Sequence, residues 1–468
     1  MNKKPLIQHS ALAFCISAFC IATAAHGAAI DAMTTIPNVA MTSLSARQRY
    51  PWNGKVDIDF SFLCDIPGAY AFIQFNATYV DGSGVTNTVP MNTFDQVTLP
   101  WCTNAGTYRV TWDSTADVPG LQVTNLTYTV TANMAKYMVV NLETGATTYM
   151  QECPDPTRTD GGWTDEYKTT KMVFRLVQPG SGKLGWGTNA FQDWNCTPVI
   201  TATFKRPFYL AIFECTQGQA KIINGNNWFG YQEVEFTGGN RSLRPVSAAS
   251  WNLWRGSAKD GYCWPNDGSK VNPSSLIGKL RARTGSDFFD MPTENEWEYA
   301  ARAGATDAWG GDGLANNQAG YAATGTASYN TNTVLNARGR YKFNGGYIDN
   351  GNGALTKPAY SCDESHGTAV VGSYSPNAWG FYDMLGNASE CTLDYYPGAS
   401  RSTSTDSVGR SVPEASKRND QLTRVIRGGR WDDTAKWCAL PFRNGDNRFY
   451  STMGQHGCRI AWRFPYAP

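Results

Sequence analysis

Short runs in which apolar and polar residues alternate dominate the first part of the chain, from about residue 33 to residue 133. Val56–Phe60 and Leu126–Val130 alternate cleanly, whereas Ala71–Phe75 is more continuously apolar. Alternation between Gly, Pro and Asn turns that recur about every ten residues is typical of strands with one buried face. The pattern predicts an all-β sandwich, Ig-like, over residues 28–135. Since no polar cluster stands out in it, we expect a spacer or stabilising domain rather than a binding module.

The length of the chain calls for a second domain. Its 468 residues exceed the roughly 250–300 at which one hydrophobic core usually stops growing. Residues 136–170 contain one apolar run and then several Pro and Gly residues, and we interpret them as a linker. The run Met172–Leu176 then opens a domain that extends over residues 171–468.

The N-terminus has the layout of a signal peptide. Lys3 and Lys4 form a positive start, an apolar stretch covers residues 11–24, and Ala25 and Gly27 are the small residues that a signal peptidase reads. This predicts a signal peptide over residues 1–27 and export to the periplasm or the extracellular space. The apolar stretch is shorter than the ~20 residues that a bilayer span requires, so we expect no membrane span.

Cysteine usage agrees with export, because an even number of cysteines remains after cleavage and disulfides persist in oxidising compartments. The remaining cysteines are Cys64, Cys102, Cys153, Cys196, Cys215, Cys263, Cys362, Cys391, Cys438 and Cys458. They include no C-x-x-C spacing, so a zinc-ribbon interpretation has little support. We expect Cys64 to pair with Cys102, since these two alone fall in the first domain, and the other pairings stay open.

One helix of the second domain is well defined by the sequence. Thr293 can cap the first turn of a helix over Pro292–Ala301, while Glu296 reaches back to the N–H of the cap residue. Trp297 and the two alanines at its end share one face and are expected in the core. A second helix is expected over residues 274–283. Residues 304–367 are rich in Gly, Asn, Thr and Ala and are expected to form long, binding loops.

Several ordered segments of the second domain carry a family resemblance. They are Arg206–Gln217, Arg244–Val246 with Ser250–Asn252, Met291–Arg302, Pro376–Asn387, Arg424–Gly429 and Gly457–Arg459. In this order, over about residues 170–466, the chain resembles the formylglycine-generating sulfatase-modifying factor family. The resemblance implies an α+β, loop-rich, C-type-lectin-like sulfatase-modifying-factor fold, with the all-β sandwich in front of it.

The resemblance also implies a copper-dependent oxidation, in which a cysteine of a client sulfatase becomes formylglycine. Copper(I) prefers thiolate ligands, and the family has two cysteines five residues apart, soon after a Gly-Gly turn. Counted from Gly428 and Gly429, these positions fall on Asp433 and Cys438. A carboxylate is a hard donor and a poor ligand for copper(I). Cys438 therefore stands as the candidate catalytic residue of an incomplete copper pair.

Two interpretations of Cys438 remain. Cys458, which stands before Arg459 where the family has an aromatic residue, could supply a second thiol and restore a metal site. The two cysteines could instead form a structural disulfide, which is the alternative we favour in an exported protein. In that case no thiol is left for copper.

Calcium is the other cofactor that the resemblance implies. In the segment Gly386–Glu390, the amide oxygen of Asn387 and the carboxylate of Glu390 take the places of the family's calcium ligands. Hard oxygen donors suit that ion. The alternative is a turn held by hydrogen bonds alone, and both stay open.

Three functions are compatible with this pattern. The one we favour is an exported member of the family that is not an oxidase and binds a peptide, protein or glycan through its loop-built groove. The second is a divergent copper- and oxygen-dependent formylglycine-generating oxidase, and the third is a structural or adhesion protein of the cell surface. A formal net charge of +1, with 17% charged residues, favours neither nucleic acid nor an anionic membrane as a partner.

Overall fold

A computed structural model of the chain divides into two compact units, Thr34–Ala135 and Lys136–Arg463. The structure describes residues 39–50, 53–64, 71–95, 101–102, 106–121, 123, 126–157, 161–186, 196–227, 240–247, 249–262, 264, 270–310, 333–345, 348–349, 355–356, 367–396, 423–446 and 456–464. The expected signal peptide lies outside these residues, as do Cys263, Cys362 and the side chains of Cys64 and Cys102.

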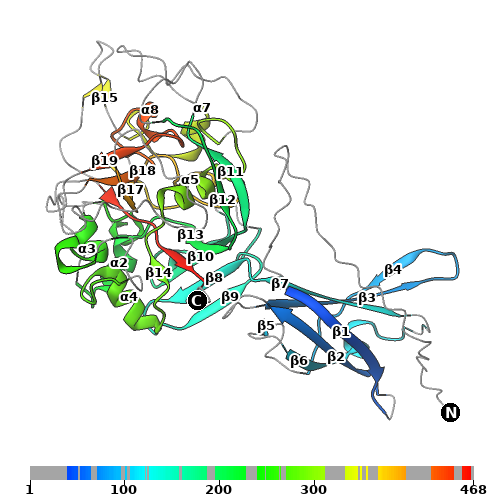
Figure 1. Cartoon of the computed structure of the whole chain (residues 1–468). Coiled ribbons are helices and arrows are strands. Elements are labelled where there is room, and N and C mark those ends of the chain that lie inside the picture. Colours follow the sequence, from blue (N-terminus) through cyan, green and yellow to red (C-terminus); the bar gives the residue numbers. More distant parts are fainter. Residues whose placement is uncertain are drawn as a thin grey trace. The chain divides into compact units, whose positions relative to one another are not determined.

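The first unit consists of two antiparallel sheets around one core. One sheet has the order β1 (Val39–Gln48), β2 (Lys55–Cys64), β6 (Gly106–Asp113). In the other, β3 (Ala71–Val80) pairs with β4 (Thr86–Val89), β5 (Trp101–Cys102) and β7 (Thr127–Met134). A short helix, α1 (Ser114–Asp117), follows β6. Figure 1 shows β1, β2 and β6 side by side.

The alternation of the sequence decides which side chains form the core of the first unit. Val56, Ile58 and Phe60 of β2 are fully buried, and they pack with Ile73 of β3 and Trp112 of β6 in one hydrophobic cluster. Because successive side chains of a strand point to opposite faces, residues two apart share the buried face. The two sheets with a common core are therefore an all-β sandwich.

The second unit is built on a six-stranded sheet in the order β14-β21-β13-β10-β8-β9. Its strands are β14 (Phe289–Asp290), β21 (Ala461–Arg463), β13 (Phe208–Ala211), β10 (Lys171–Val177), β8 (Tyr137–Asn141) and β9 (Thr147–Met150). The strand nearest the C-terminus thus lies inside the sheet, between β13 and β14.

The segment that we expected to be a linker, residues 136–170, is part of this second unit. Its apolar run, residues 137–140, forms β8, which pairs with β10 on one side and β9 on the other. The four side chains of that run are buried. A short apolar run between polar stretches is compatible with a linker as well as with a buried inner strand. Here the run forms a strand, because its side chains are buried in the core of the second unit.

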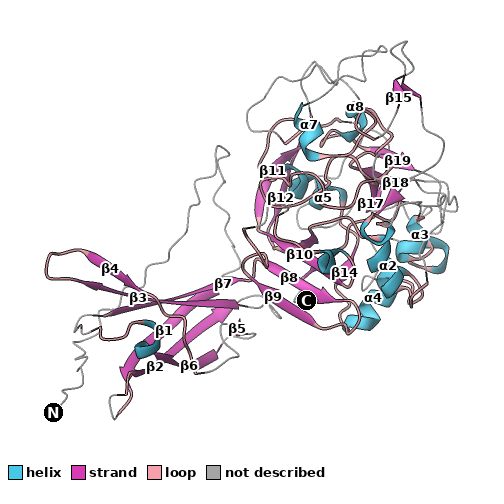
Figure 2. Cartoon of the chain, turned by 180° about the vertical axis from the view of Figure 1, so that it is seen from behind, coloured by secondary structure: helices cyan, strands magenta, loops and turns pink. Residues whose placement is uncertain are grey.

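Smaller elements surround the central sheet, as Figure 2 shows. A four-stranded sheet has the order β19 (Asn444–Asp446), β18 (Arg424–Arg427), β17 (Ser389–Tyr395), β20 (His456–Gly457). Two-stranded sheets join β11 (Gly180–Leu184) to β12 (Ile200–Phe204) and β15 (Ile348–Asp349) to β16 (Leu355–Thr356). The helices are α2 (Gln217–Ile223), α3 (Trp251–Arg255), α4 (Leu276–Thr284), α5 (Glu294–Arg302), α7 (Thr333–Arg338) and α8 (Ala435–Cys438), with 3-10 turns at Asp165–Lys168, Arg241–Leu243 and Ala258–Asp260. In the part of the chain that is described, no helix is long and apolar enough to cross a membrane.

Helix α5 begins where the sequence predicts. The hydroxyl of Thr293 accepts from the Glu296 N–H at 3.2 Å, and the Glu296 carboxylate accepts from the Thr293 N–H at 2.7 Å, so the predicted capping box is confirmed. Trp297 is fully buried, with Ala300 and Ala301 beside it in the core. The predicted helix over residues 274–283 is also present, as α4.

Each of the three glutamates of α5 pairs with an arginine from the last part of the chain, and Glu298 also pairs with Arg302 of α5 itself. The pairs are Glu294 with Arg443, Glu296 with Arg463, and Glu298 with Arg302 and Arg427. All three carboxylates are buried. Buried charges of this kind are tolerated only when they are paired and hydrogen-bonded. Arg427, Arg443 and Arg463 therefore fix three C-terminal segments to α5.

Candidate functional site

A cavity of about 260 Å³ opens beside the Gly428-Gly429 turn in the second unit. Its lining comes from β17, β18, β19 and β20, from α8 and from the turn that follows β18. The lining residues are Ser389, Ile426, Gly428, Gly429, Arg430, Asp433, Trp437, Phe442, Asn444, Gly445 and His456. The cavity thus lies where the resemblance places the copper cysteines, at Asp433 and next to Cys438.

The conformation of the turn requires glycine at both positions, 428 and 429. Both have left-handed backbone angles, with φ of +90° at Gly428 and +73° at Gly429. A Cβ on Gly429 would lie 2.7 Å from the Cys438 sulfur and 2.7 Å from the Trp437 carbonyl oxygen. Only glycine adopts this conformation without strain and leaves room for α8. The backbone of the turn therefore lies close against α8.

Asp433 is held by Arg430 in the wall of the cavity. One carboxylate oxygen accepts from the Arg430 backbone N–H at 3.0 Å and the other from its guanidinium at 3.3 Å. Arg430 also pairs with Asp432, at 3.3 Å. Burial raises the pKa of Asp433, and the Arg430 cation opposes that shift. The carboxylate at the first copper position is therefore part of a local ion-pair network.

Cys438 is fully buried at the C-terminal end of α8 and does not line the cavity. Its sulfur lies 3.8 Å from the Arg430 carbonyl oxygen. Burial raises the pKa of this thiol well above its ordinary value, and the carboxylates of Asp433 and Asp432 raise it further. Because a nucleophile must be the thiolate, this rise in pKa disfavours the reactive form of the Cys438 thiol.

The disulfide that we favoured between Cys438 and Cys458 is absent, since both cysteines are free thiols. The Cys458 sulfur lies elsewhere, 3.8 Å from the Cys391 carbonyl oxygen and 3.1 Å from that of Arg459. Burial raises the pKa of Cys458 as well. The donors near the copper position are then one protonated thiol and one ion-paired carboxylate, which do not fit copper(I).

The two candidate calcium ligands are already engaged by protein groups. Asn387 donates its amide N–H to Glu214 at 2.6 Å and accepts from the Ala369 N–H at 2.8 Å. The Glu390 carboxylate accepts from Arg459 at 2.9 Å and from the Trp297 indole N–H at 2.8 Å. An adjacent guanidinium repels a second cation.

The described residues include no group of three or more His, Cys, Asp or Glu side chains placed to hold a metal. Asn387 and Glu390, arranged as they are, do not fit calcium. The interpretation as a turn held by hydrogen bonds agrees better with these contacts. Asn387 itself has φ of +62°, a left-handed conformation that Asn adopts more readily than most residues.

Thermal unfolding in calcium and in EDTA tests the calcium role. An ion that binds only the folded state raises the melting temperature in proportion to its affinity. Since both candidate ligands are saturated by protein donors, we expect the same melting temperature in the two buffers. A calcium-dependent rise that Glu390→Gln abolishes would show that the ion displaces Arg459.

A pair of residues in the cavity was not found by sequence reasoning. The Ser389 hydroxyl and the His456 Nδ1 are 2.5 Å apart, on the paired strands β17 and β20. These positions are 67 residues apart in the chain. That separation in the chain gave sequence reasoning no reason to place them together.

A pair of buried carboxyls behind Asn387 was missed as well. Glu214 and Asp383 are both buried, and the charge of Asp383 makes Glu214 harder to ionise. Burial raises the pKa of Asp383 to about 6, and burial also raises the pKa of Glu214 well above its ordinary value. Nothing in the sequence indicates that residues so far apart are neighbours.

Comparisons with known proteins agree with the resemblance. A family model described as a sulfatase-modifying factor enzyme 1-like domain matches residues 163–464. The inactive Cα-formylglycine-generating enzyme 2 of Bos taurus is 28% identical over 149 residues, which are 31% of this chain and 33% of that relative. The chain thus spans about a third of the length of this curated relative.

Solved structures similar to this chain include two bacterial proteins. Variable protein 1 of Treponema denticola is 18% identical, with a TM-score of 0.42, over 63% of this chain and 95% of that protein. PvdO from Pseudomonas aeruginosa is 17% identical, with a TM-score of 0.42, over 62% of this chain and 94% of that protein.

Proposed function

The chain belongs to the sulfatase-modifying factor family, and from that premise we propose that it is an exported, non-oxidising member that binds a ligand in the cavity beside Gly428 and Gly429. The ligand is a peptide, a protein or a glycan. In this proposal the second unit has the C-type-lectin-like fold of the family, and the first unit is an Ig-like spacer that carries it.

The proposal rests on the contacts and burial of Asp433 and Cys438, the two residues at the positions where the resemblance places the copper ligands. Asp433 is tied to Arg430, and Cys438 is enclosed and protonated. Oxygen activation at a soft metal needs two thiolates that can reach it. The cavity next to these residues is retained, so a binding surface persists where the family chemistry has lost its ligands. The curated relative whose name describes it as inactive supports the same interpretation.

Copper(I) titration of the reduced protein tests the loss of the metal site. We expect no tight one-to-one uptake by the wild-type chain, because a hard carboxylate and a protonated thiol are poor donors for the ion. A competition assay with a copper(I) chelator measures this. The matched control is Asp433→Cys, which restores two cysteines five residues apart and should bind copper(I) more tightly than the wild type. Equal, tight binding by both proteins would contradict the proposal.

An oxidase remains the second candidate, because Cys438 and Cys458 are free thiols. If it is correct, a sulfatase-type peptide that contains Cys-x-Pro-x-Arg gains an aldehyde when copper and oxygen are present. Mass spectrometry of the peptide after incubation detects that product. Under the proposed function the peptide stays unmodified, and Cys438→Ser changes nothing.

A further inference from the structure

The charges of the cavity wall largely cancel. Arg430 is the one cation among the lining residues with a permanent charge, and it pairs with Asp433, which also lines the cavity, and with Asp432 behind it. An anionic ligand finds no unmatched cation in this network, which holds two carboxylates for one guanidinium. The cavity is therefore suited to a neutral ligand with many hydroxyl groups.

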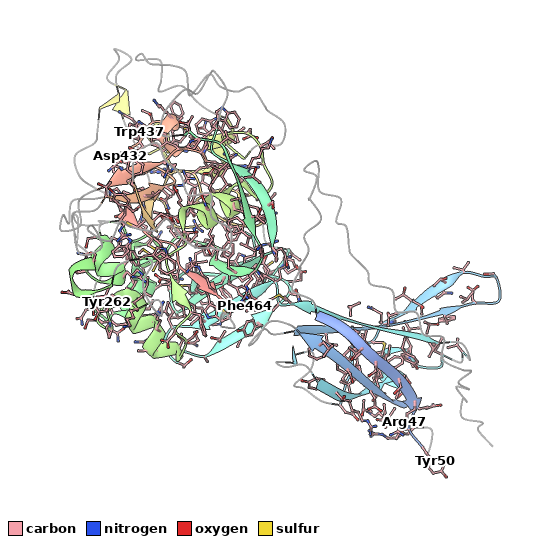
Figure 3. All side chains as sticks on the ribbon, viewed as in Figure 1. Arg47, Tyr50, Tyr262, Asp432, Trp437 and Phe464 are labelled. Carbon is pink, nitrogen blue, oxygen red and sulfur yellow. The ribbon has the colours of Figure 1, made fainter. Side chains whose placement is uncertain are left out.

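An aromatic platform forms one wall. Trp437 of α8 lines the cavity and leaves 38% of its surface exposed. Its ring centre lies 4.7 Å from that of Phe442, with the planes tilted by 59°, so the indole is held in place from one side. Figure 3 marks Trp437 and Asp432 at the same end of the second unit. A rigid, flat, partly exposed indole offers a stacking surface at small entropic cost.

Polar groups surround this platform. The Ser389–His456 pair and Asn444, whose amide oxygen accepts from the Gly445 N–H at 2.8 Å, line the same cavity as Trp437. Hydroxyl, imidazole and amide groups both donate and accept hydrogen bonds. A sugar ring has apolar C–H faces and a rim of hydroxyls, so it matches an indole wall with such groups around it.

The size of the cavity limits the ligand to one ring. Pockets for small molecules usually measure about 300–1,000 Å³, and this one, at about 260 Å³, lies just below that range. An extended peptide needs a longer groove or a free strand edge along which to lie. A single ring at the end of a chain fits the space better.

We propose, on the basis of the ligand-binding role above, that this cavity binds one neutral sugar residue of a glycan, stacked on Trp437 and hydrogen-bonded to Asn444 and the Ser389–His456 pair. The contact requires no calcium, because every group in it belongs to the protein.

The test is binding of the full-length chain, in EDTA, to an array of immobilised glycans that end in glucose, galactose, mannose, N-acetylglucosamine, fucose or N-acetylneuraminic acid. We expect binding to glycans with one of the neutral ends and none to the anionic N-acetylneuraminic acid. Calorimetry with the methyl glycoside of the best terminal sugar then gives the affinity. Trp437→Ala should lower it about tenfold and Asn444→Ala about fivefold.

Two further variants, one conservative and one remote from the cavity, test whether the indole itself binds the sugar. Trp437→Phe keeps a ring and should retain most of the affinity. Phe288→Ala removes an aromatic of similar exposure, 39%, that does not line the cavity, and should bind as the wild type does. If circular dichroism shows that Trp437→Ala does not fold, the sugar affinities of Trp437→Phe and Asn444→Ala are compared with that of the wild type instead.

Failure to bind any neutral sugar, or an affinity that neither Trp437→Ala nor Asn444→Ala changes, overturns the sugar site. A parallel peptide array separates this failure from failure of the proposed function. If the chain binds a peptide but no sugar, and Trp437→Ala abolishes that binding, the glycan ligand is wrong and the ligand-binding role of the cavity stands. The copper(I) titration remains independent of both arrays.

Discussion

Replacement of Arg459 by methionine is expected to destabilise the second unit by about 3–5 kcal/mol, the range found when one partner of a buried ion pair is removed. Arg459 is fully buried and contacts both oxygens of Glu390, at 2.9–3.2 Å. It also donates to the backbone carbonyls of Ala211, Ile212 and Tyr382 at 2.8–2.9 Å. Methionine has a similar length but no donor, so the carboxylate and three carbonyls lose their partner in a place that water does not reach.

Because the chain has two units, a single denaturation midpoint is not a sufficient measurement. Hydrogen–deuterium exchange of peptides from β13 and β21, read at several denaturant concentrations, reports the opening of the second unit alone. The matched control is Arg109→Met, which removes an exposed arginine that pairs with Asp59 at the surface of the first unit. Surface pairs contribute little, so that variant should behave as the wild type. Similar exchange in both variants would mean that Arg459 is dispensable.

Replacement of Asp383 by asparagine should stabilise the protein at neutral pH and flatten its dependence on pH. Asp383 is enclosed beside Glu214, and, among the described residues, one of its oxygens has no hydrogen-bond partner. Burial raises its pKa from 3.8 to about 6, with Glu390 adding to the rise and Arg459 and Lys168 opposing it. At 1.36 kcal/mol for each pH unit, ionising this carboxyl in the folded state costs about 3 kcal/mol.

The sign of the pH effect follows from the raised pKa. Below about pH 4 the carboxyl is protonated in the folded and in the unfolded chain, so its full contribution to stability is present. Between about pH 4 and 6 only the unfolded chain ionises, and stability falls as the pH rises. Above about pH 6 the contribution is lost.

Unfolding curves of the wild type and Asp383→Asn between pH 4 and 8 measure this difference. Asparagine keeps an oxygen for the Gly372 N–H, which donates to Asp383 at 2.7 Å, and its amide can donate toward Glu214. The free energy of unfolding of the variant should therefore exceed that of the wild type at pH 7 and converge with it near pH 4. Parallel curves over the whole range would show that Asp383 does not titrate in this window.

Several elements could be predicted from local sequence patterns because their physical cause is also local. The alternation of Val56, Ile58 and Phe60 specifies which face of β2 is buried, whichever strand lies beside it. Thr293 and Glu296 specify the start of α5 through two hydrogen bonds within four residues. The left-handed Gly429 is required by a turn whose neighbours in the chain include Cys438 itself.

The expected linker and the expected disulfide depended on distant partners and were wrong for that reason. An apolar run of four residues becomes an inner strand only if two other strands flank it, as β9 and β10 do for β8. Two cysteines bond only when the fold brings their sulfur atoms together. Cys438 lies on α8, whereas Cys458 follows β20 and contacts β17.

The sequence by itself determined the family and the strand-rich character of the first unit, since each depends on residue type and order along the chain. The tertiary structure alone decided that Cys438 is enclosed and that Glu390 is taken by Arg459. It also placed Ser389, Trp437 and His456 around one cavity. Burial and pairing are set by groups that long loops separate in the chain, and desolvation, which controls their charge, exists only once the core has formed.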